Sequence, residues 1–142
     1  MYGRIINALF ALYLFIFVFS VPMLMFDLVP AWGQWMGGFL LALQGTLITC
    51  WLMYREGLRG AIAGLLIGIL SFGVEYLGVT TGVPFGPYTY TATLGLHIGP
   101  VPYAIPFAWM MVVPGAFMTA APFGRPSVVI GVAALLALTL DL

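Results

Sequence analysis

The segment Glu75–Tyr103, EYLGVTTGVPFGPYTYTATLGLHIGPVPY, separates two apolar halves of the chain and carries most of its chemistry. It contains four tyrosines, the single histidine and one of the four acidic residues. Its many glycines and prolines exclude a membrane-spanning helix over residues 79–103. Because the remainder of the chain is nearly pure hydrocarbon, we expect the flanking helices to serve as a scaffold for this segment.

Composition places the chain among integral membrane proteins. Of its 142 residues 63% are hydrophobic and 6% are charged, whereas soluble proteins carry about 25% charged residues. The net charge is zero, so we expect no nucleic acid partner. The lone Cys50 has no second cysteine for an internal disulfide and is expected in the core. The oligomeric state does not follow from the sequence.

Five apolar segments predict an all-α, polytopic transmembrane helical bundle, because a helix needs about 20 mostly apolar residues to cross a bilayer. The predicted helices are Ile5–Phe26, Trp32–Tyr54, Leu58–Gly78, Ala104–Ala121 and Ser127–Leu142. Pro22 is expected to kink the first helix, and Pro106 and Pro114 to interrupt the fourth. The last helix lacks a polar flank, so residues 1–142 are expected to be one membrane domain, the amino-terminal part of a longer enzyme.

The arginines predict the orientation in the cell (plasma) membrane. With a cytoplasmic amino terminus every arginine lies on the cytoplasmic side, as the positive-inside rule requires: Arg4, Arg55, Arg59 and Arg125. The Gly/Pro/Tyr-rich segment over residues 79–103 then forms a long loop at the outer face. Non-helical backbone at membrane depth has to be buried in protein or line a wet cavity, so we expect this loop to cap a lateral lipid pocket.

Glu75 shares one face of the third predicted helix with Gly64, Gly68 and Ser71, at helical spacing. Gly60 extends this stripe of small residues, whose expected role is close helix packing. At 1.5 Å per residue, Glu75 lies about 25 Å from the start of its helix, near the outer edge of a hydrocarbon layer of roughly 30 Å.

Asp141 lies similarly deep in the fifth predicted helix, about 21 Å from Ser127. The third and fifth helices run in the same direction, so we expect the carboxyl groups of Glu75 and Asp141 to meet at one level. Desolvation favours the neutral form of a carboxyl group, and a protonated acid beside an apolar slot can protonate an alkene. A second carboxyl can position or deprotonate water.

Glu75 and Asp141 are therefore the candidate catalytic residues, since ionisable groups inside a membrane protein are costly and usually functional. For Glu75 the alternative is a structural carboxyl group that hydrogen-bonds the outer loop or helix ends. Water that captures a cation is expected to be held by Asp141, Tyr88 or Thr81.

Aromatic side chains around Glu75 are expected to line a hydrocarbon slot for an alkene, because ring faces stabilise a nearby cation. Tyr88 and Tyr90 alternate with threonines, which predicts a short extended piece with both tyrosines on one side. The alternative for each aromatic residue is a place in the interfacial belt. The candidate substrate-binding residues are Tyr76, Thr81, Phe85, Tyr88, Tyr90, His97, Tyr103 and Trp109.

His97 could be a proton shuttle, a metal ligand or a loop residue with a local hydrogen bond. It has no HxxxH or HxxE partner, so we expect no metal site. A phosphate-binding glycine loop, a nucleophile elbow and a dinucleotide fingerprint are all missing from the sequence. We therefore expect no cofactor, and neither ATP, NAD nor serine-hydrolase chemistry.

The residue order in two segments resembles a known family. EYLGVTTGVPFGPYTYTATLG (Glu75–Gly95) and GPVPYAIPFAWMMV (Gly99–Val112) look like the membrane-bound carotenoid hydratases of the CruF type, which include bisanhydrobacterioruberin hydratases. The resemblance implies cofactor-free addition of water to a terminal isoprenoid double bond. The implied substrate is an acyclic or monocyclic carotenoid such as lycopene, γ-carotene or a C50 precursor, and the product is a tertiary alcohol. Family members continue well beyond an Asp-containing fifth helix.

Two other functions fit the same residues. A non-enzymatic membrane component would bind or transport the lipid without changing it. A cofactor-free prenyl-lipid cyclase or isomerase would use the same acid but lose a proton, which leaves the mass of the lipid unchanged. A hydratase instead adds the mass of one water molecule.

Overall fold

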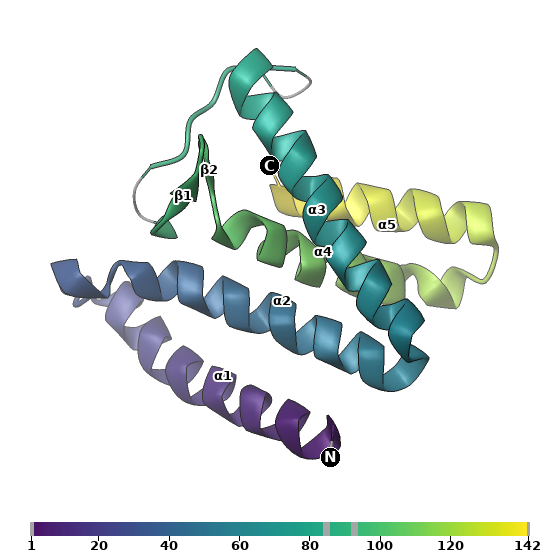
Figure 1. Cartoon of the computed structure of the whole chain (residues 1–142), viewed down its shortest axis with the longest axis horizontal. Helices are drawn as coiled ribbons and strands as arrows, with labels where there is room; N and C mark the ends of the chain where they lie inside the picture. The colour runs from purple at the N-terminus through teal and green to yellow at the C-terminus, as the bar shows by residue number, and fades with distance from the viewer. Residues whose placement is uncertain (1, 84–85, 92–93, 142) are drawn as a thin grey trace.

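The computed structural model is a bundle of five helices with a small hairpin between the third and the fourth (Figure 1). It describes residues 2–83, 86–91 and 94–141. The helices are α1 (Tyr2–Met25), α2 (Trp35–Glu56), α3 (Leu58–Thr81), α4 (Ala104–Ala120) and α5 (Pro126–Asp141), with 3-10 turns η1 (Ala31–Gly33) and η3 (Ala121–Phe123). The predicted all-α polytopic bundle is confirmed.

Four helices, α1 to α4, are long and apolar enough to cross a bilayer in the described part of the chain, and α5 is a shorter apolar helix. The chain is an integral membrane protein. The α2–α3 and α4–α5 turns lie at the right of Figure 1, whereas the α1–α2 connection and the hairpin lie at the left. Successive connections therefore alternate between the two ends of the bundle.

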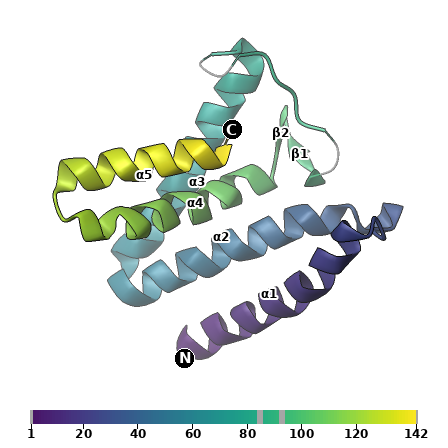
Figure 2. The same cartoon turned by 180° about the vertical axis from the view of Figure 1, so that it is seen from behind.

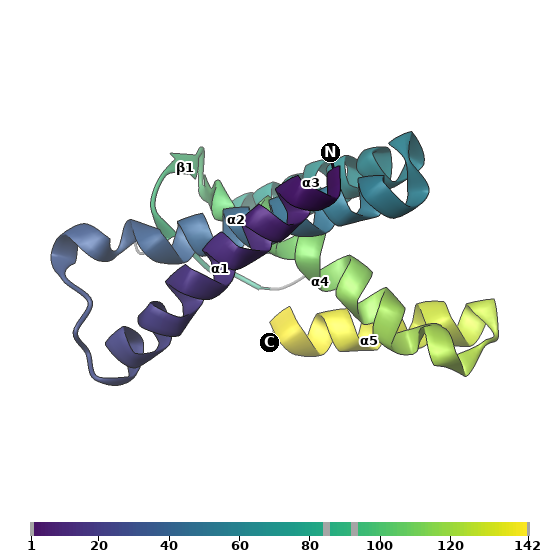
Figure 3. The same ribbon diagram turned by 90° about the horizontal axis from the view of Figure 1, so that it is seen from below.

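α2 and α4 form the centre of the bundle. α2 packs against α1, α3 and α4, and α4 also packs against α3 and α5. α1 and α5 flank this centre on opposite sides, as the front and back views show (Figures 1 and 2). From below, the α4–α5 hairpin stands apart from α1 (Figure 3). A hydrogen bond of 2.8 Å from Gln44 Nε2 to the Tyr13 hydroxyl joins α2 to α1.

Glycines allow the central helices to approach each other closely. A Cβ atom on Gly45 of α2 would lie 2.5 Å from the Phe107 carbonyl oxygen of α4. On α3 a Cβ on Gly64 would meet Thr49, and one on Gly68 would meet Met110. Gly60, Gly64 and Gly68 are all buried, which confirms the predicted packing role of this stripe.

Most helix ends lie within a few residues of their predicted positions, and two differences concern the helices that carry the site. α3 continues beyond Gly78 to Thr81 and ends where Gly82 adopts a left-handed conformation with φ of 71°. α4 is continuous, so the predicted interruption at Pro106 and Pro114 is wrong. Pro106 lies in the first turn, where backbone N–H groups have no partner within the helix. Pro114 is buried against neighbouring helices, which stabilise the helix despite the missing bond.

The segment before α4 contains a hairpin that the sequence analysis did not predict. β1 (His97–Ile98) pairs antiparallel with β2 (Val101–Pro102). Two residues per strand are too few to give a readable alternation of polar and apolar side chains. Val101 and Pro102 are fully buried, and β2 packs against α3. The hairpin thus anchors the end of the loop beside α3.

Candidate active site

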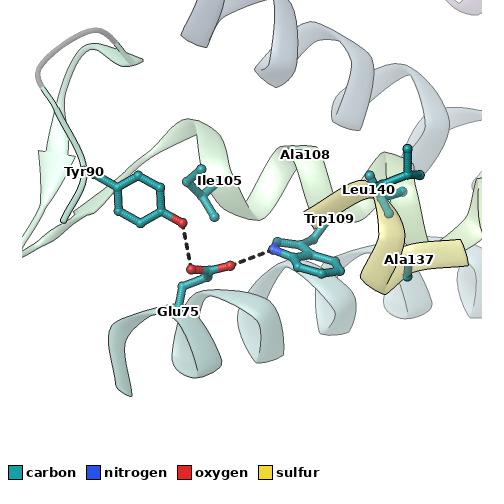
Figure 4. Close-up of a pocket in the computed structure, with 8 residues that line it drawn as sticks. Glu75, Tyr90, Ile105, Ala108, Trp109, Ala137 and Leu140 are labelled. Atoms are coloured by element: carbon teal, nitrogen blue, oxygen red, sulfur yellow. Dashed lines mark hydrogen bonds between the residues drawn. The ribbon is translucent and has the colours of Figure 1, made fainter. Parts of the chain in front are cut away.

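Glu75 lies on α3 with only 4% of its surface exposed, and three neutral donors converge on its carboxyl group. The hydroxyls of Tyr88 and Tyr90 donate to Oε2 at 2.8 and 2.7 Å. The Trp109 Nε1–H donates to Oε1 at 3.0 Å, and Figure 4 shows the bonds from Tyr90 and Trp109. These bonds offset much of the cost of burying a carboxyl group.

Three separate segments supply this arrangement. Glu75 comes from the buried face of α3, Trp109 from the second turn of α4, and the two tyrosines from the loop between them. The rings of Tyr88 and Tyr90 meet edge to face with centroids 5.7 Å apart. Because both hydroxyls reach the same oxygen, the prediction that the two tyrosines point to one side is confirmed. These contacts also fit the alternative given for Glu75 in the sequence analysis, a structural carboxyl group that hydrogen-bonds the loop over residues 79–103.

The two carboxyl oxygens of Glu75 have different chemical surroundings. An indole N–H can only donate, so Oε1 has to act as an acceptor from Trp109 in either protonation state. A tyrosine hydroxyl can donate or accept, so the hydroxyls of Tyr88 and Tyr90 are compatible with either a bare or a protonated Oε2. A proton on Oε2 therefore has hydroxyl oxygens beside it that can accept its hydrogen bond, whereas the indole at Oε1 cannot accept one.

A cavity of about 110 Å³ lies beside this carboxyl group, between α3, α4 and α5. Its walls are mostly apolar, and the lining residues are Glu75, Tyr90, Ile105, Ala108, Trp109, Val112, Ala137 and Leu140. Figure 4 shows Ala137 and Leu140 of α5 on the side of Trp109. Pockets for drug-sized ligands measure about 300–1,000 Å³, so this cavity has room for only the end of a long chain.

Sequence reasoning missed the apolar part of this lining, although α4 carried a signal for it. Ile105, Ala108, Trp109 and Val112 follow the i, i+3, i+4, i+7 spacing of one helical face. The α5 contribution had no local signal, because only the tertiary packing brings this helix to the cavity.

Four of the described candidate substrate-binding residues neither line the Glu75 cavity nor hydrogen-bond its carboxyl group. His97 is exposed, and its Nδ1 lies 2.9 Å from the Gly95 carbonyl oxygen. This contact fits the alternative of a loop residue with a local hydrogen bond. Tyr76 is 43% exposed and packs against Phe72. Tyr103 donates its backbone N–H to Leu96, and its hydroxyl approaches Gly38 of α2.

The fourth residue, Thr81, is exposed at the end of α3. Its hydroxyl donates to the Leu77 carbonyl oxygen at 2.7 Å. A separate cavity of about 570 Å³ lies at the end of α3 beside the following loop, and Thr81 and Tyr88 both line it. It is called the outer cavity below. Tyr88 therefore belongs to the wall of this outer cavity while its hydroxyl contacts Glu75.

Two predicted residues are not tested by the structure. Phe85 lies outside the described residues. Asp141 is the last residue of α5, and its side chain is likewise outside the described part. The preceding residue, Leu140, lines the Glu75 cavity. The meeting of the Glu75 and Asp141 carboxyl groups stays a prediction.

Comparisons with known proteins agree with the resemblance noted for Glu75–Val112. The pattern of the family described as "Carotenoid biosynthesis protein" matches residues 36–142. A bisanhydrobacterioruberin hydratase from Haloarcula japonica is 34% identical over 61 residues, which cover 42% of this chain and 21% of the hydratase. The match thus spans about a fifth of the length of this curated relative. No solved structure matches the chain.

The hydrogen bonds to Glu75 predict a measurable loss of stability. Tyr90→Phe keeps the ring but removes the hydroxyl, so the free energy of unfolding should fall by about 1–3 kcal/mol, the range for a bond to a buried polar partner. Unfolding of the purified protein in micelles by increasing SDS measures this change. In a Glu75→Leu background the loss should shrink, because the acceptor is gone.

Tyr76→Phe is the matched control, because Tyr76 is a neighbouring, half-exposed tyrosine outside the Glu75 cavity. It should leave stability within about 0.5 kcal/mol of the wild-type value, as surface substitutions usually do. Equal losses for Tyr76→Phe and Tyr90→Phe would show that the Glu75 contact contributes nothing specific.

Proposed function

The chain belongs to the carotenoid biosynthesis protein family, and from this membership we propose that it adds water to a terminal isoprenoid double bond of a carotenoid. The proposed substrate is an acyclic or monocyclic carotenoid, such as lycopene, γ-carotene or a C50 precursor, and the product is a tertiary alcohol. The observation that carries the proposal is the buried Glu75 carboxyl group, held by three donors at the wall of an apolar cavity.

The cavity suits one end of a carotenoid. Its apolar walls, such as Ile105, Val112 and Leu140, match a dimethyl-substituted double bond. Its volume of about 110 Å³ leaves no room for the polyene, which would extend out along the lipid-facing surface of the helices. Substrate selection would then depend on the end group more than on the length of the chain.

In the proposed first step Glu75 protonates the alkene from Oε2. The π electrons form a new C–H bond at the CH carbon, and the O–H electron pair stays on the carboxylate. The positive charge is left on the carbon that carries two methyl groups. The faces of Tyr90 and Trp109 and the new carboxylate stabilise this tertiary cation, while Trp109, Tyr88 and Tyr90 hydrogen-bond the carboxylate.

In the proposed second step water adds to the cation. The oxygen lone pair forms the C–O bond, and the oxonium ion loses one proton to the Glu75 carboxylate, either directly or through Asp141, which then passes a proton on to Glu75. The acid is thereby regenerated, and the overall change is the addition of one water without a cofactor. We propose that this water comes from the outer cavity lined by Tyr88 and Thr81, because Tyr88 lines that cavity and also donates its hydroxyl to Oε2.

Glu75→Gln should abolish hydration while leaving the protein in the membrane. The amide has a similar shape but no acidic proton, and the loss of general acid catalysis costs about 10²–10⁴-fold in rate. Pigments extracted from a lycopene-producing host and analysed by mass spectrometry measure the gain of one water. Glu56→Gln, at the far end of α2, should retain the wild-type product.

Wild-type hydration by Glu75→Gln would eliminate Glu75 as the acid. A wild-type protein that accumulates bound, unchanged pigment would favour the transport alternative. A new pigment of unchanged mass would favour a cyclase or isomerase.

Filling the cavity should block the substrate without touching the carboxyl group. Ala137 of α5 lines the cavity, so Ala137→Leu adds three carbon atoms to that space and should lower hydration by about 5- to 150-fold, since overfilling a site costs about 1–3 kcal/mol. Ala134→Leu, one turn away and exposed, should keep wild-type product yield. The pigment assay above, with protein levels matched by immunoblot, compares the two. Equal yields of hydrated pigment from Ala137→Leu and Ala134→Leu would show that the reaction does not take place in the Glu75 cavity.

We also propose that the chain lies in the plasma membrane with its amino terminus in the cytoplasm, as the arginine distribution favours. His97 in the exposed hairpin then lies outside. In a Cys50→Ala background, a cysteine at position 97 should react with a membrane-impermeant maleimide added to intact cells, and a cysteine at Glu56 should react only after lysis. The reverse pattern would invert the orientation.

A further inference from the structure

A further cavity, of about 310 Å³, lies between α1, α2 and α4 at the end of the bundle that holds the amino terminus (Figure 1). It is called the inner groove below. It shares no lining residue with the Glu75 cavity, and its volume falls in the range of about 300–1,000 Å³ typical of small-molecule sites. Its lining is mostly apolar and consists of Ile6, Asn7, Phe10, Leu47, Ile48, Trp51 and Met118.

Arg55 lies against one wall of the inner groove. Its guanidinium carbon is 5.1 Å from the ring centre of Trp51, one turn earlier on α2, which is close enough for a cation–π interaction. This interaction uses the positive charge and leaves the N–H groups available for an acceptor. Among the described residues no carboxylate forms an ion pair with Arg55, although Glu56 is the next residue. The groove therefore has a cation at its edge that no described acidic side chain neutralises.

The charge at this end of the bundle is unbalanced. Among the described residues its one carboxylate is that of the exposed Glu56. Its four arginines form no salt bridge in the described part of the chain: Arg4, Arg55, Arg59 and Arg125. Arg4 lies one turn before Asn7 on α1, so two of the four arginines flank the groove, one on each helix. An anionic group would complement this edge.

The apolar wall and the charged edge together select an amphiphile with an anionic head. The wall extends over about 12 Å along α2 from Leu47 to the level of Arg55, at 1.5 Å per residue, which suits part of an acyl chain. Arginine is well suited to phosphate oxygens, and the cytoplasmic leaflet contains anionic phospholipids. A free phosphate would leave the apolar wall uncovered, whereas a hydrocarbon without a head would leave the arginines without an anion.

We propose that an anionic phospholipid binds here, with one acyl chain in the inner groove and its phosphate on Arg55 and Arg4. Because the groove is lined by α1, α2 and α4, the bound lipid holds α1 against the centre of the bundle. The site is separate from catalysis at Glu75. Its place in the cytoplasmic leaflet follows from the proposed orientation, whereas the binding itself does not depend on it.

Photolabelling of the full chain in phosphatidylcholine nanodiscs tests this site. The probe is phosphatidylglycerol with a diazirine on one acyl chain, and peptide mapping locates the label. We expect label within residues 6–10 and 47–51. Replacing part of the phosphatidylcholine by unlabelled phosphatidylglycerol should displace the probe, and replacing it by phosphatidylethanolamine should not. Glycerol 3-phosphate, which represents the headgroup without its chains, should not displace the probe either.

One pair of variants tests the charge. Arg55→Gln should lower displaceable labelling by about fivefold, the effect of one arginine at an anionic membrane surface. Arg125→Gln is the matched control, because it makes the same charge change in the α4–α5 turn, and the α4–α5 hairpin stands apart from α1 (Figure 3). It should leave labelling within about twofold of wild type, because salt screens exposed charges beyond about 8 Å.

A second pair tests the groove. Met118→Trp adds bulk to the groove wall and should lower displaceable labelling by about fivefold or more, since overfilling a site is unfavourable by about that factor or more. Phe117→Trp is the matched control, because Phe117 is the neighbouring residue on α4, is similarly exposed and does not line the groove. It should keep wild-type labelling.

Full labelling in Met118→Trp would overturn the proposal, because the label would then report lipid-facing surface. Equal losses in Arg55→Gln and Arg125→Gln would overturn the phosphate contact at Arg55, since overall charge would then explain the binding. Displacement by phosphatidylethanolamine or by glycerol 3-phosphate would overturn the assignment of an anionic phospholipid. Glu75→Gln should retain the labelling even where it abolishes hydration, so a failure of the hydratase proposal leaves this binding test independent.

Discussion

The structure depends on how one carboxyl group is satisfied inside an apolar bundle. An unpaired buried carboxyl group would cost several kcal/mol, and Glu75 avoids this cost through three neutral donors. Those donors come from α4 and from a loop that has no regular structure of its own at Tyr88 and Tyr90. The same contacts that satisfy the carboxyl group therefore tie the loop to the ends of α3 and α4.

The rest of the fold makes these contacts possible. Close approach at Gly68 places α3 against α4 near Met110, one position beyond Trp109. Val101 and Pro102 are buried beside α3 and fix the other end of the loop. Because both ends are anchored, the tyrosines between them reach one oxygen with little conformational freedom to lose. Such preorganisation is what a reaction through a charged intermediate requires.

The two oxygens of the Glu75 carboxyl group have different hydrogen-bond partners, so they are chemically distinct. Trp109 donates to Oε1, whereas Oε2 accepts from two hydroxyls, which are chemically able to accept as well as donate. Tyr90 lines the small apolar cavity, and Tyr88 lines the outer cavity. A single carboxyl oxygen is thus linked to an apolar space on one side and to a more polar space on the other, which suits the proposed meeting of an alkene with water.

The sequence by itself determined the membrane class, the five helices, the protein-facing position of Glu75 on α3 and the common side of Tyr88 and Tyr90, because hydropathy and short-range spacing are local properties. The continuity of α4 at Pro114, the hairpin and the contribution of Ala137 and Leu140 were decided only by the tertiary structure. The hairpin pairs neighbouring residues, but its two-residue strands are too short to show a pattern. The other two features depend on contacts between segments distant in the chain, which no local pattern encodes. His97 and Tyr76 were predicted at the site because they lie near Glu75 in the sequence. In the structure neither residue lines the Glu75 cavity, because tertiary packing and not sequence distance decides which side chains reach it.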